Sequence, residues 1–270
     1  DSDEAVLLAT YDVESSRSDD QSVLSCSSFE ELLETDIDAV IISTYVSFSA
    51  EYVVRALNAG KHVLVEKPLE INLKRAQQMI TACRTVNVQL SCIFQNRFSP
   101  DYAKLKNAVD SGLLGNLIMG NAYIPWYRTR QYYSSSSWKG SKDGDGGAAF
   151  INQGIHTIDL LLDIMGPAKS VFGKIQNVVH DIEGEDLGVG LVTFKSGALG
   201  SIQASTALYP GYPERLEIYG NKGSVILEAG KIISWNIQNE DISPPSEDNS
   251  SQPSGSSNPL AISHQLHKVQ

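Results

Sequence analysis

The most constraining feature of the sequence is a strict alternation of short apolar runs with amphipathic stretches before Phe98. Apolar runs without internal polar alternation are typical of parallel strands that are covered on both faces, and strands that alternate with helices form doubly wound sheets. The sequence therefore predicts an α/β domain with a parallel sheet over residues 1–97. The predicted strands are 6–10, 38–43, 62–65 and 88–94, and the predicted helices between them are 50–58 and 73–85.

Two overlapping Ser-x-x-Glu patterns add a further helix start in this half. Ser27 and Ser28 are each followed three residues later by a glutamate, Glu30 and Glu31. A Ser hydroxyl at this position accepts a hydrogen bond from the first helical turn, and the Glu reaches back to the cap. We expect a helix to begin at this point.

The pattern changes after Phe98 and predicts a different kind of domain. Strand-like runs now follow one another through Gly-rich turns, and residues 195–197 and 220–223 have the composition of hairpin turns. An aromatic, Ser- and Gly-rich segment (126–147) is expected to be a loop, and a Ser-, Pro- and Asn-rich segment (241–258) a flexible one. The sequence predicts an α+β domain over residues 98–270, with an open, mostly antiparallel sheet and helices on one face. The strands are expected at 117–123, 171–179, 187–194, 198–204, 215–219, 224–227 and 232–235, and the helices at 102–111 and 151–165.

Charge and cysteine content exclude several classes of partner. The net charge of −11 argues against nucleic acid, which is bound through clustered Lys and Arg. It also gives no long-range attraction to an acidic substrate, so local basic residues would have to bind one. No apolar run reaches the length of a membrane span. Three cysteines without metal-ligand spacing predict reduced thiols, no metal site and a cytoplasmic protein.

A first candidate site is the run Glu66-Lys67-Pro68, which closes a predicted buried strand. Ligands of doubly wound sheets bind beyond the carboxyl ends of the strands. A half-buried Lys at that point can be tuned for acid–base chemistry. The alternative is an ordinary surface lysine that follows a strand. The cleft between the two domains is the default place for a site.

A second candidate lies on the predicted helix 151–165. Asn152 and His156 are four residues apart and so share one helical face, and Asp159 lies close to that face. Such a polar group among apolar positions indicates a site, although a hydrogen-bonded core histidine would give the same pattern.

A third candidate is Asp12, at the end of the first predicted strand. A carboxylate at that place can accept hydrogen bonds from the ribose hydroxyls of NAD. Arg17 could instead bind the 2′-phosphate of NADP, so both cofactors stay open.

Taken together, these segments resemble the glucose–fructose oxidoreductase / inositol dehydrogenase / MocA (Gfo/Idh/MocA) family. The resemblance spans nearly the whole chain and is carried by four segments in order: 38–44 (DAVIIST), 59–69 (AGKHVLVEKPL), 94–98 (FQNRF) and 152–160 (NQGIHTIDL). It implies a Rossmann domain, a substrate domain with an open sheet, and hydride exchange between NAD(P) and a sugar-like carbinol. It also implies a homodimer or homotetramer.

The resemblance assigns residues to three roles. The predicted catalytic residues are Lys67, His156 and Asn152. Those predicted to border the cofactor are Asp12, Arg17, Thr44, Ser49, Glu66, Lys67, Pro68 and Asn96. Those predicted to border the substrate are Arg97, Trp126, Arg128, Asn152 and His156.

The sequence departs from the family pattern in three places. Tyr45 stands where members usually have Pro, Ser49 near where they have His, and Asn152 where many have Asp. No Gly-x-Gly-x-x-Gly loop, which would hold the cofactor's pyrophosphate, precedes Asp12. In the classic strand order, the strand before that loop is the centre of the sheet. We therefore expect the sequence to be clipped at both ends.

These observations favour an NAD(P)-dependent dehydrogenase or reductase that acts on a CH–OH group of a sugar, sugar acid or polyol. Two alternatives stay open. One is a redox-neutral glycosidase that oxidises and re-reduces its sugar through bound NAD. The other is a catalytically silent binding or regulatory protein on the same fold, which the missing glycine loop and Ser49 favour.

Overall fold

The computed structural model describes residues 4–13 and 23–238. Two predicted features, Arg17 and the flexible loop at 241–258, lie outside these residues.

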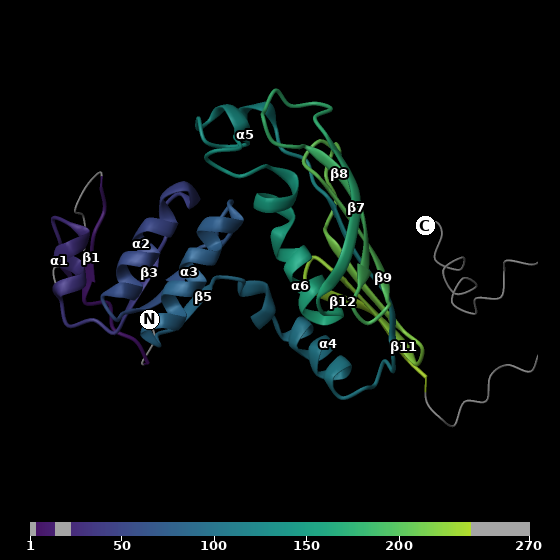
Figure 1. The fold of residues 1–270 in the computed structure, drawn as a ribbon. Helices are drawn as coiled ribbons and strands as arrows, with labels where there is room; N and C mark the ends of the chain where they lie inside the picture. Colours follow the sequence, from purple (N-terminus) through teal and green to yellow (C-terminus); the bar gives the residue numbers. More distant parts are fainter. Residues whose placement is uncertain (1–3, 14–22, 239–270) are drawn as a thin grey trace, which may run out of the picture. The chain divides into compact units, whose positions relative to one another are not determined.

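A parallel three-stranded sheet forms the centre of the first domain (Figure 1). Its strands lie in the order β3 (Ala39–Ile42), β4 (His62–Val65) and β5 (Leu90–Cys92). Helices α2 (Val46–Asn58) and α3 (Leu73–Val86) connect them. Their apolar side chains form one core with the strands, as the alternating pattern predicts. The parallel α/β prediction is confirmed. The expectation of cover on both faces is wrong for β3, because Val40 and Ile42 are buried whereas Ala39 and Ile41 are exposed.

The beginning of this domain differs from the prediction. Only Ala9–Thr10 of the predicted strand 6–10 pairs, as β1, with β2 (Leu24–Ser25), and these two form a sheet of their own. Val6, Leu7 and Leu8 are exposed, so the expectation of a fully buried strand is wrong. The reason is that no described element packs over these three side chains.

The helix start at Ser27–Glu31 is confirmed. Helix α1 spans Phe29–Glu34, and the Ser28 hydroxyl accepts a hydrogen bond from the Glu31 N–H at 3.1 Å. The Glu31 carboxylate in turn accepts hydrogen bonds from the N–H and hydroxyl of Ser27, at 2.7 and 2.6 Å. These reciprocal bonds satisfy backbone donors that the first helical turn leaves open.

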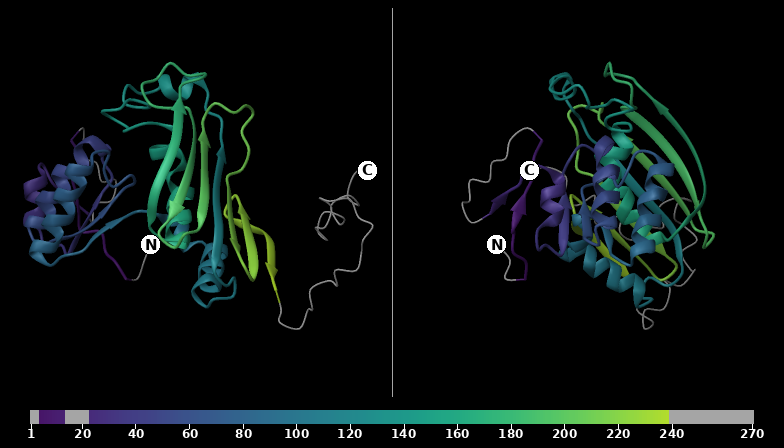
Figure 2. Two further views of the ribbon diagram at one scale, coloured as in Figure 1. Left: turned by 45° about the vertical axis from the view of Figure 1, so that its right-hand side comes forward. Right: turned by 60° about the vertical axis from the view of Figure 1, so that its left-hand side comes forward.

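A seven-stranded sheet forms the second domain, in the order β12-β11-β10-β6-β9-β8-β7 (Figure 2). The β6–β9 pair is parallel, and the β10–β11, β6–β10, β7–β8 and β8–β9 pairs are antiparallel. The predicted open, mostly antiparallel sheet is confirmed. The strands are β6 (Leu117–Pro125), β7 (Ala168–Gln176), β8 (Leu187–Phe194), β9 (Leu199–Ser205), β10 (Arg215–Gly220), β11 (Gly223–Glu228) and β12 (Lys231–Ile237).

One face of this sheet is covered by α6 (Ile155–Met165), which packs against β6 and β10 (Figures 1 and 2). Gly120 in β6 permits the close approach, because a Cβ at this position would lie 2.7 Å from Met165 Cγ and 2.8 Å from Leu161 Cδ1. Helix α4 (Pro100–Asp110) follows the short 3₁₀ turn Gln95–Phe98 that leads out of the first domain. The packing places α6 with its polar residues at a defined position relative to the sheet.

Two segments of the second domain differ from their predictions. The predicted loop 126–147 contains a short helix, α5 (Arg130–Ser134). The predicted single helix 151–165 begins instead as a π-helical turn, Ala149–Gly154, and becomes α-helical only from Ile155. In this turn the Gln153 N–H bonds to Ala148 O, five residues back. Asn152 and His156 therefore belong to turns of different geometry, and a regular four-residue spacing does not describe them.

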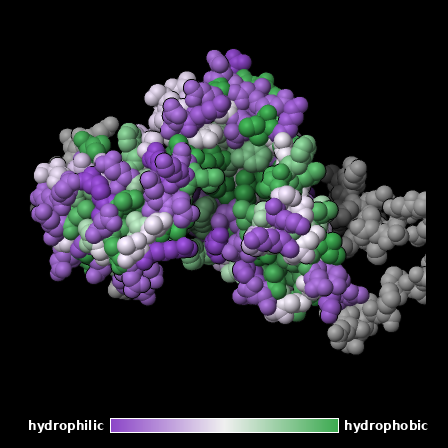
Figure 3. Space-filling view, viewed as in Figure 1, coloured by the Kyte–Doolittle hydropathy of each residue, from purple (hydrophilic) through white to green (hydrophobic). Residues whose placement is uncertain are grey.

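Within residues 4–13 and 23–238, no helix is long and apolar enough to cross a membrane. Large hydrophobic side chains of the seven-stranded sheet, such as Phe172 and Leu191, are exposed. The face of the molecule in Figure 3 mixes hydrophilic and hydrophobic residues.

Candidate functional site

Lys67 makes the central contact of the candidate site. It follows β4, and its ammonium donates to both Asn152 Oδ1 at 2.9 Å and Asn152 O at 3.0 Å. Burial lowers the pKa of Lys67 below its ordinary value, and the carboxylates of Asp145 and Glu66 oppose this shift. The structure thus brings together two of the three predicted catalytic residues, and their roles stay predictions.

Asp145 extends this contact and was missed by the sequence analysis. Asn152 Nδ2 donates to Asp145 Oδ1 at 2.5 Å, and the Gly140 N–H donates to Asp145 Oδ2 at 3.0 Å. The Asp145 side chain is buried, and burial raises the pKa of its carboxyl, whereas its hydrogen bonds and Lys67 act in the opposite direction. A chain Lys67–Asn152–Asp145 therefore carries a positive charge at one end and a buried carboxyl at the other. Asp145 lies among Gly, Ser and Lys residues with no motif, and no sequence signal marked it.

His156 lies in the first turn of α6, and its Nδ1 is buried without a hydrogen-bond partner among the described residues. Its ring packs edge-on against Phe94, with 6.1 Å between centroids. Burial lowers the pKa of His156, as does the nearby Lys67 charge, whereas Asp159 and Glu66 act to raise it. A buried polar atom without a partner costs free energy in the folded protein, so a ligand that bonds to this nitrogen would remove that cost.

Arg97, a predicted substrate residue, is engaged within the protein. Its guanidinium donates to both carboxylate oxygens of Asp159, at 2.6 and 2.7 Å, and to Asp163 at 2.9 Å. Asp163 also accepts the Tyr102 hydroxyl at 2.5 Å. The hydrogen bonds to Asp159 raise the pKa of Arg97, and burial raises that of Tyr102. This network joins the 3₁₀ turn and α4 to α6. Contact of Arg97 with a substrate stays a prediction.

Arg128, another predicted substrate residue, lies just beyond β6. Its Nε and Nη2 both donate to Gln153 Oε1, at 3.0 and 2.7 Å. The guanidinium also lies over the ring of Trp126, a further predicted substrate residue, and over that of Tyr132, at 5.2 and 5.4 Å from the centroids. Gln153 follows Asn152 in the π-helical turn, so this turn presents one side chain to Lys67 and the next to Arg128.

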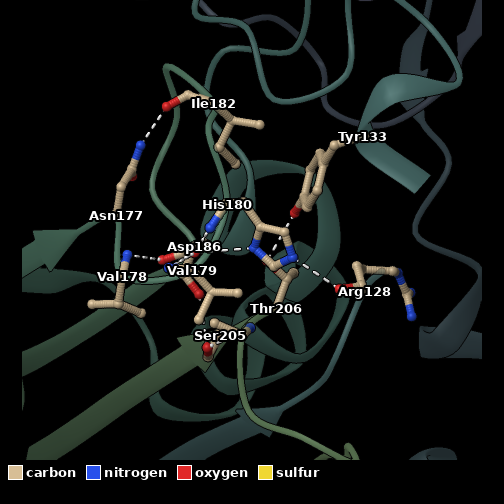
Figure 4. A network of polar contacts seen from close by, with 11 residues as sticks. Arg128, Tyr133, Asn177, Val178, Val179, His180, Ile182, Asp186, Ser205 and Thr206 are labelled. Atoms are coloured by element: carbon tan, nitrogen blue, oxygen red, sulfur yellow. Dashed lines mark hydrogen bonds and ion pairs between the residues drawn. The ribbon is translucent and has the colours of Figure 1, made fainter. Parts of the chain in front are cut away.

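The backbone of Arg128 is fixed by a buried polar network (Figure 4). His180 Nε2 lies 2.8 Å from Arg128 O, and His180 Nδ1 lies 3.0 Å from Asp186 Oδ2. Asp186 also accepts the N–H groups of Val178, Val179 and His180 at 2.8–2.9 Å. Burial alone would raise the pKa of the Asp186 carboxyl, but these N–H groups hold it below its ordinary value. The sequence analysis assigned no role to either residue of this pair.

The predicted cofactor residues lie where strands end. Thr44 follows β3, Glu66 and Pro68 follow β4, and Asn96 follows β5, and because these strands are parallel their carboxyl ends share one edge of the sheet. Asp12 follows β1, which belongs to the separate two-stranded sheet.

Ser49 is buried, and its hydroxyl donates to Val46 O at 2.9 Å within α2. In this arrangement the Ser49 hydroxyl is used inside its own helix. Its assignment to the cofactor, like those of the other residues, stays a prediction. Among the described residues, no three His, Cys, Asp or Glu side chains group in a way that could hold a metal ion.

Comparison with known proteins gives consistent matches over most of the chain. Residues 2–94 match the model of the oxidoreductase family with an NAD-binding Rossmann fold, and residues 102–226 match that of the GFO/IDH/MocA C-terminal domain. The chain is 32% identical to a myo-inositol 2-dehydrogenase of Thermotoga maritima, over 73% of this chain and 59% of that protein. It is 29% identical to a scyllo-inositol 2-dehydrogenase (NAD(+)) of Bacillus subtilis, over 74% of this chain and 57% of that protein. The chain thus spans less than two thirds of these curated relatives.

A solved structure agrees with these matches. The WlbA dehydrogenase from Bordetella pertussis, in complex with NADH and UDP-GlcNAcA, superposes with a TM-score of 0.74 at 30% identity. The match covers 80% of this chain and 68% of that one.

Proposed function

Because the chain belongs to the Gfo/Idh/MocA oxidoreductase family, we propose that the protein is an NAD-dependent enzyme that acts on a CH–OH group of a sugar, sugar acid or polyol. The observation that carries the proposal is the Lys67 ammonium held on Asn152, with the unpartnered Nδ1 of the neighbouring His156. The relatives' names support the substrate class, since two are inositol dehydrogenases and the solved WlbA dehydrogenase holds NADH and UDP-GlcNAcA.

The residues present fit a dinucleotide. Thr44, Glu66 and Asn96 follow three adjacent parallel strands, which is where doubly wound sheets bind such ligands. When bound, NAD supplies the carbon that accepts or donates the hydride. We infer a preference for NAD over NADP because the Asp12 carboxylate would accept ribose hydroxyls and repel a 2′-phosphate.

The chain's own residues handle the proton. With its pKa lowered by burial, His156 is neutral near pH 7 and can accept the proton of a substrate hydroxyl at Nδ1. The Lys67 ammonium can donate to the same substrate oxygen and stabilise the charge that develops on it. Asn152 holds Lys67 in place through two oxygen atoms.

The full-length protein tests this function directly. With NAD and a panel of inositols, aldohexoses and their acids, we expect reduction of the cofactor, followed by its absorbance, and slower reduction of NADP. Incorporation of solvent deuterium into a sugar without net cofactor reduction would instead support a redox-neutral glycosidase. NAD binding without turnover of any member of the panel would support a silent binding protein.

We also infer that the protein forms homo-oligomers through the open face of the seven-stranded sheet. The register places the cross-strand pair Phe172–Leu191 on the face opposite to that of buried Val192, and both residues of the pair are well exposed. Exposed apolar patches of this kind are typical of protein–protein contacts.

A cytoplasmic location stays a prediction, and all three cysteines are free thiols in the structure.

Phe172→Glu is expected to dissociate the oligomer, because it places a charge at the centre of the contact. Val171→Glu is the matched control, since Val171 is similarly exposed but lies on the other face of the same strand. Sedimentation velocity measures both. An assembly that survives Phe172→Glu, or a protein that is monomeric to begin with, would contradict the proposed interface.

A further inference from the structure

Arg128 is held in place at both its backbone and its side chain. Its N–H donates to Thr206 O at 2.7 Å, and its carbonyl oxygen contacts His180 of the buried Asp186–His180 pair (Figure 4). Its guanidinium is fixed by the two hydrogen bonds to Gln153, which is itself 9% exposed. A long side chain that is ordered in this way has already lost its conformational entropy before any ligand arrives.

The charge of Arg128 is not neutralised by these contacts. Its acceptors are the side-chain amide oxygen of Gln153 and the backbone oxygen of Tyr127, and both are neutral. In the described part of the chain, no carboxylate oxygen lies within 4.0 Å of the guanidinium. Three of the five guanidinium N–H groups make these hydrogen bonds, so donors remain for a ligand. A Glu at position 153 would neutralise the charge, whereas Gln positions the guanidinium without doing so.

Lys139 adds a second cation on the same aromatic ring. Its ammonium lies 4.5 Å from the centroid of Tyr132, on which Arg128 also packs, and 5.7 Å from that of Trp138. Its hydrogen-bond partner is the Ser135 hydroxyl, at 2.8 Å, which is again neutral. Within the residues that the structure describes, no carboxylate oxygen lies within 4.0 Å of the Lys139 ammonium either.

Two cations that pack on one ring and have no carboxylate partner among the described residues are unusual in a chain of net charge −11. An anion that contacts both cations would supply the missing counter-charge. Arginine matches carboxylate and phosphate oxygens through paired N–H donors, and lysine adds a point charge. The pair also stands beside the proposed reaction site, because Gln153 and Asn152 are adjacent residues of one turn.

We propose that Arg128 and Lys139 form an anion subsite, which binds a carboxylate or phosphate group carried by the sugar substrate. The proposal rests on the proposed function and narrows its substrate class from sugars and polyols in general to those that carry a negative charge. Because the chain as a whole is acidic, attraction of the substrate depends on this local pair and not on the net charge.

Binding to the full-length protein tests the subsite without requiring turnover. Trp126 and Trp138 are two of the three tryptophans and both contact these cations, so their fluorescence reports occupancy. The probes are glucose and galactose, each compared with its uronic acid and its 6-phosphate. We expect at least one charged sugar to bind with a Kd about tenfold or more below that of its neutral parent. The anion is identified by whichever derivative, the uronic acid or the 6-phosphate, has the lower Kd.

Substitutions then assign the preference to its residues. Arg128→Gln and Lys139→Gln should each raise the Kd of the charged sugar about tenfold, with little change for the neutral one. Arg128→Lys, which keeps the charge, should retain part of the preference. Lys142→Gln makes the same charge change at an exposed position of the same segment and should have no effect. Thermal unfolding of each variant checks that it is folded.

Three results would overturn the subsite: no charged sugar binding at all, equal binding of charged and neutral sugars, or a preference that survives both Gln substitutions. These outcomes are separable from the proposed function. Rapid turnover of neutral polyols without any preference for charge would remove the subsite and keep the dehydrogenase. Arg128-dependent binding of a sugar acid without cofactor reduction by any substrate would do the reverse.

Discussion

Lys67→Ala is expected to lower kcat by about a hundredfold or more, which is the range for loss of a group that acts on a proton or on developing charge in the transition state. The ammonium is fixed by two hydrogen bonds to Asn152, so its removal also leaves two Asn152 oxygen atoms without this donor. The affinity for NAD should change far less, because Lys67 is one of several residues at the strand ends. Steady-state kinetics and NAD titration of the full-length protein measure the two effects separately.

Two further variants make this result specific. Lys67→Met keeps most of the side-chain volume and should be as impaired as the alanine variant. Lys74→Ala removes a positive charge from the exposed first turn of α3 and should leave kcat unchanged. Near-native turnover of Lys67→Met would reduce Lys67 to a structural or cofactor-positioning residue.

His156→Ala is expected to abolish most activity together with the acidic limb of the kcat/KM profile. In the oxidative direction the neutral imidazole accepts the substrate proton, so activity falls as the pH drops through the pKa of His156. Burial and Lys67 lower that pKa, which places the limb on the acidic side of the ordinary histidine range. If the limb survives in His156→Ala, another residue is the titrating group.

Asn152 gives a complementary test of the same assignment. A carboxylate at position 152 would favour the charged forms of His156 and Lys67 and so move the acidic limb to higher pH. In the single variant Asn152→Asp, however, the new carboxyl would lie beside Asp145, whose Oδ1 is 2.5 Å from Asn152 Nδ2. Two carboxyls at that distance would share a proton, so the added negative charge would be reduced. We therefore expect the upward shift most clearly in the double variant Asn152→Asp, Asp145→Asn, which exchanges the two groups. An unshifted limb in that variant would contradict the role of His156.

Local pattern was sufficient for much of the fold. The strands β3 and β4 follow from their apolar runs and the helices α2 and α3 from helical periodicity, although β3 is buried on one face only. The start of α1 follows from the Ser27–Glu31 capping pattern, which satisfies open backbone donors with neighbouring side chains. Lys67 was singled out because it follows a predicted buried strand, and His156 because it is a polar residue among the apolar positions of a predicted helix.

Tertiary structure decided the rest of the site. Asp145 is buried beside Asn152 only because its loop folds back on the rest of the domain, which no local pattern records. Arg97 meets Asp159, and Arg128 meets Gln153, across long separations in sequence.

The sequence by itself determined most of the strands and helices and which polar residues stand at their ends, because those properties depend on near neighbours. It could not determine the π-helical turn at Ala149–Gly154, which sets where Asn152 and Gln153 lie. Nor could it show that, among the described residues, the charges of Arg128 and Lys139 meet neutral acceptors and aromatic rings instead of carboxylates. Those facts depend on which distant side chains share a volume, and only the packed chain fixes that.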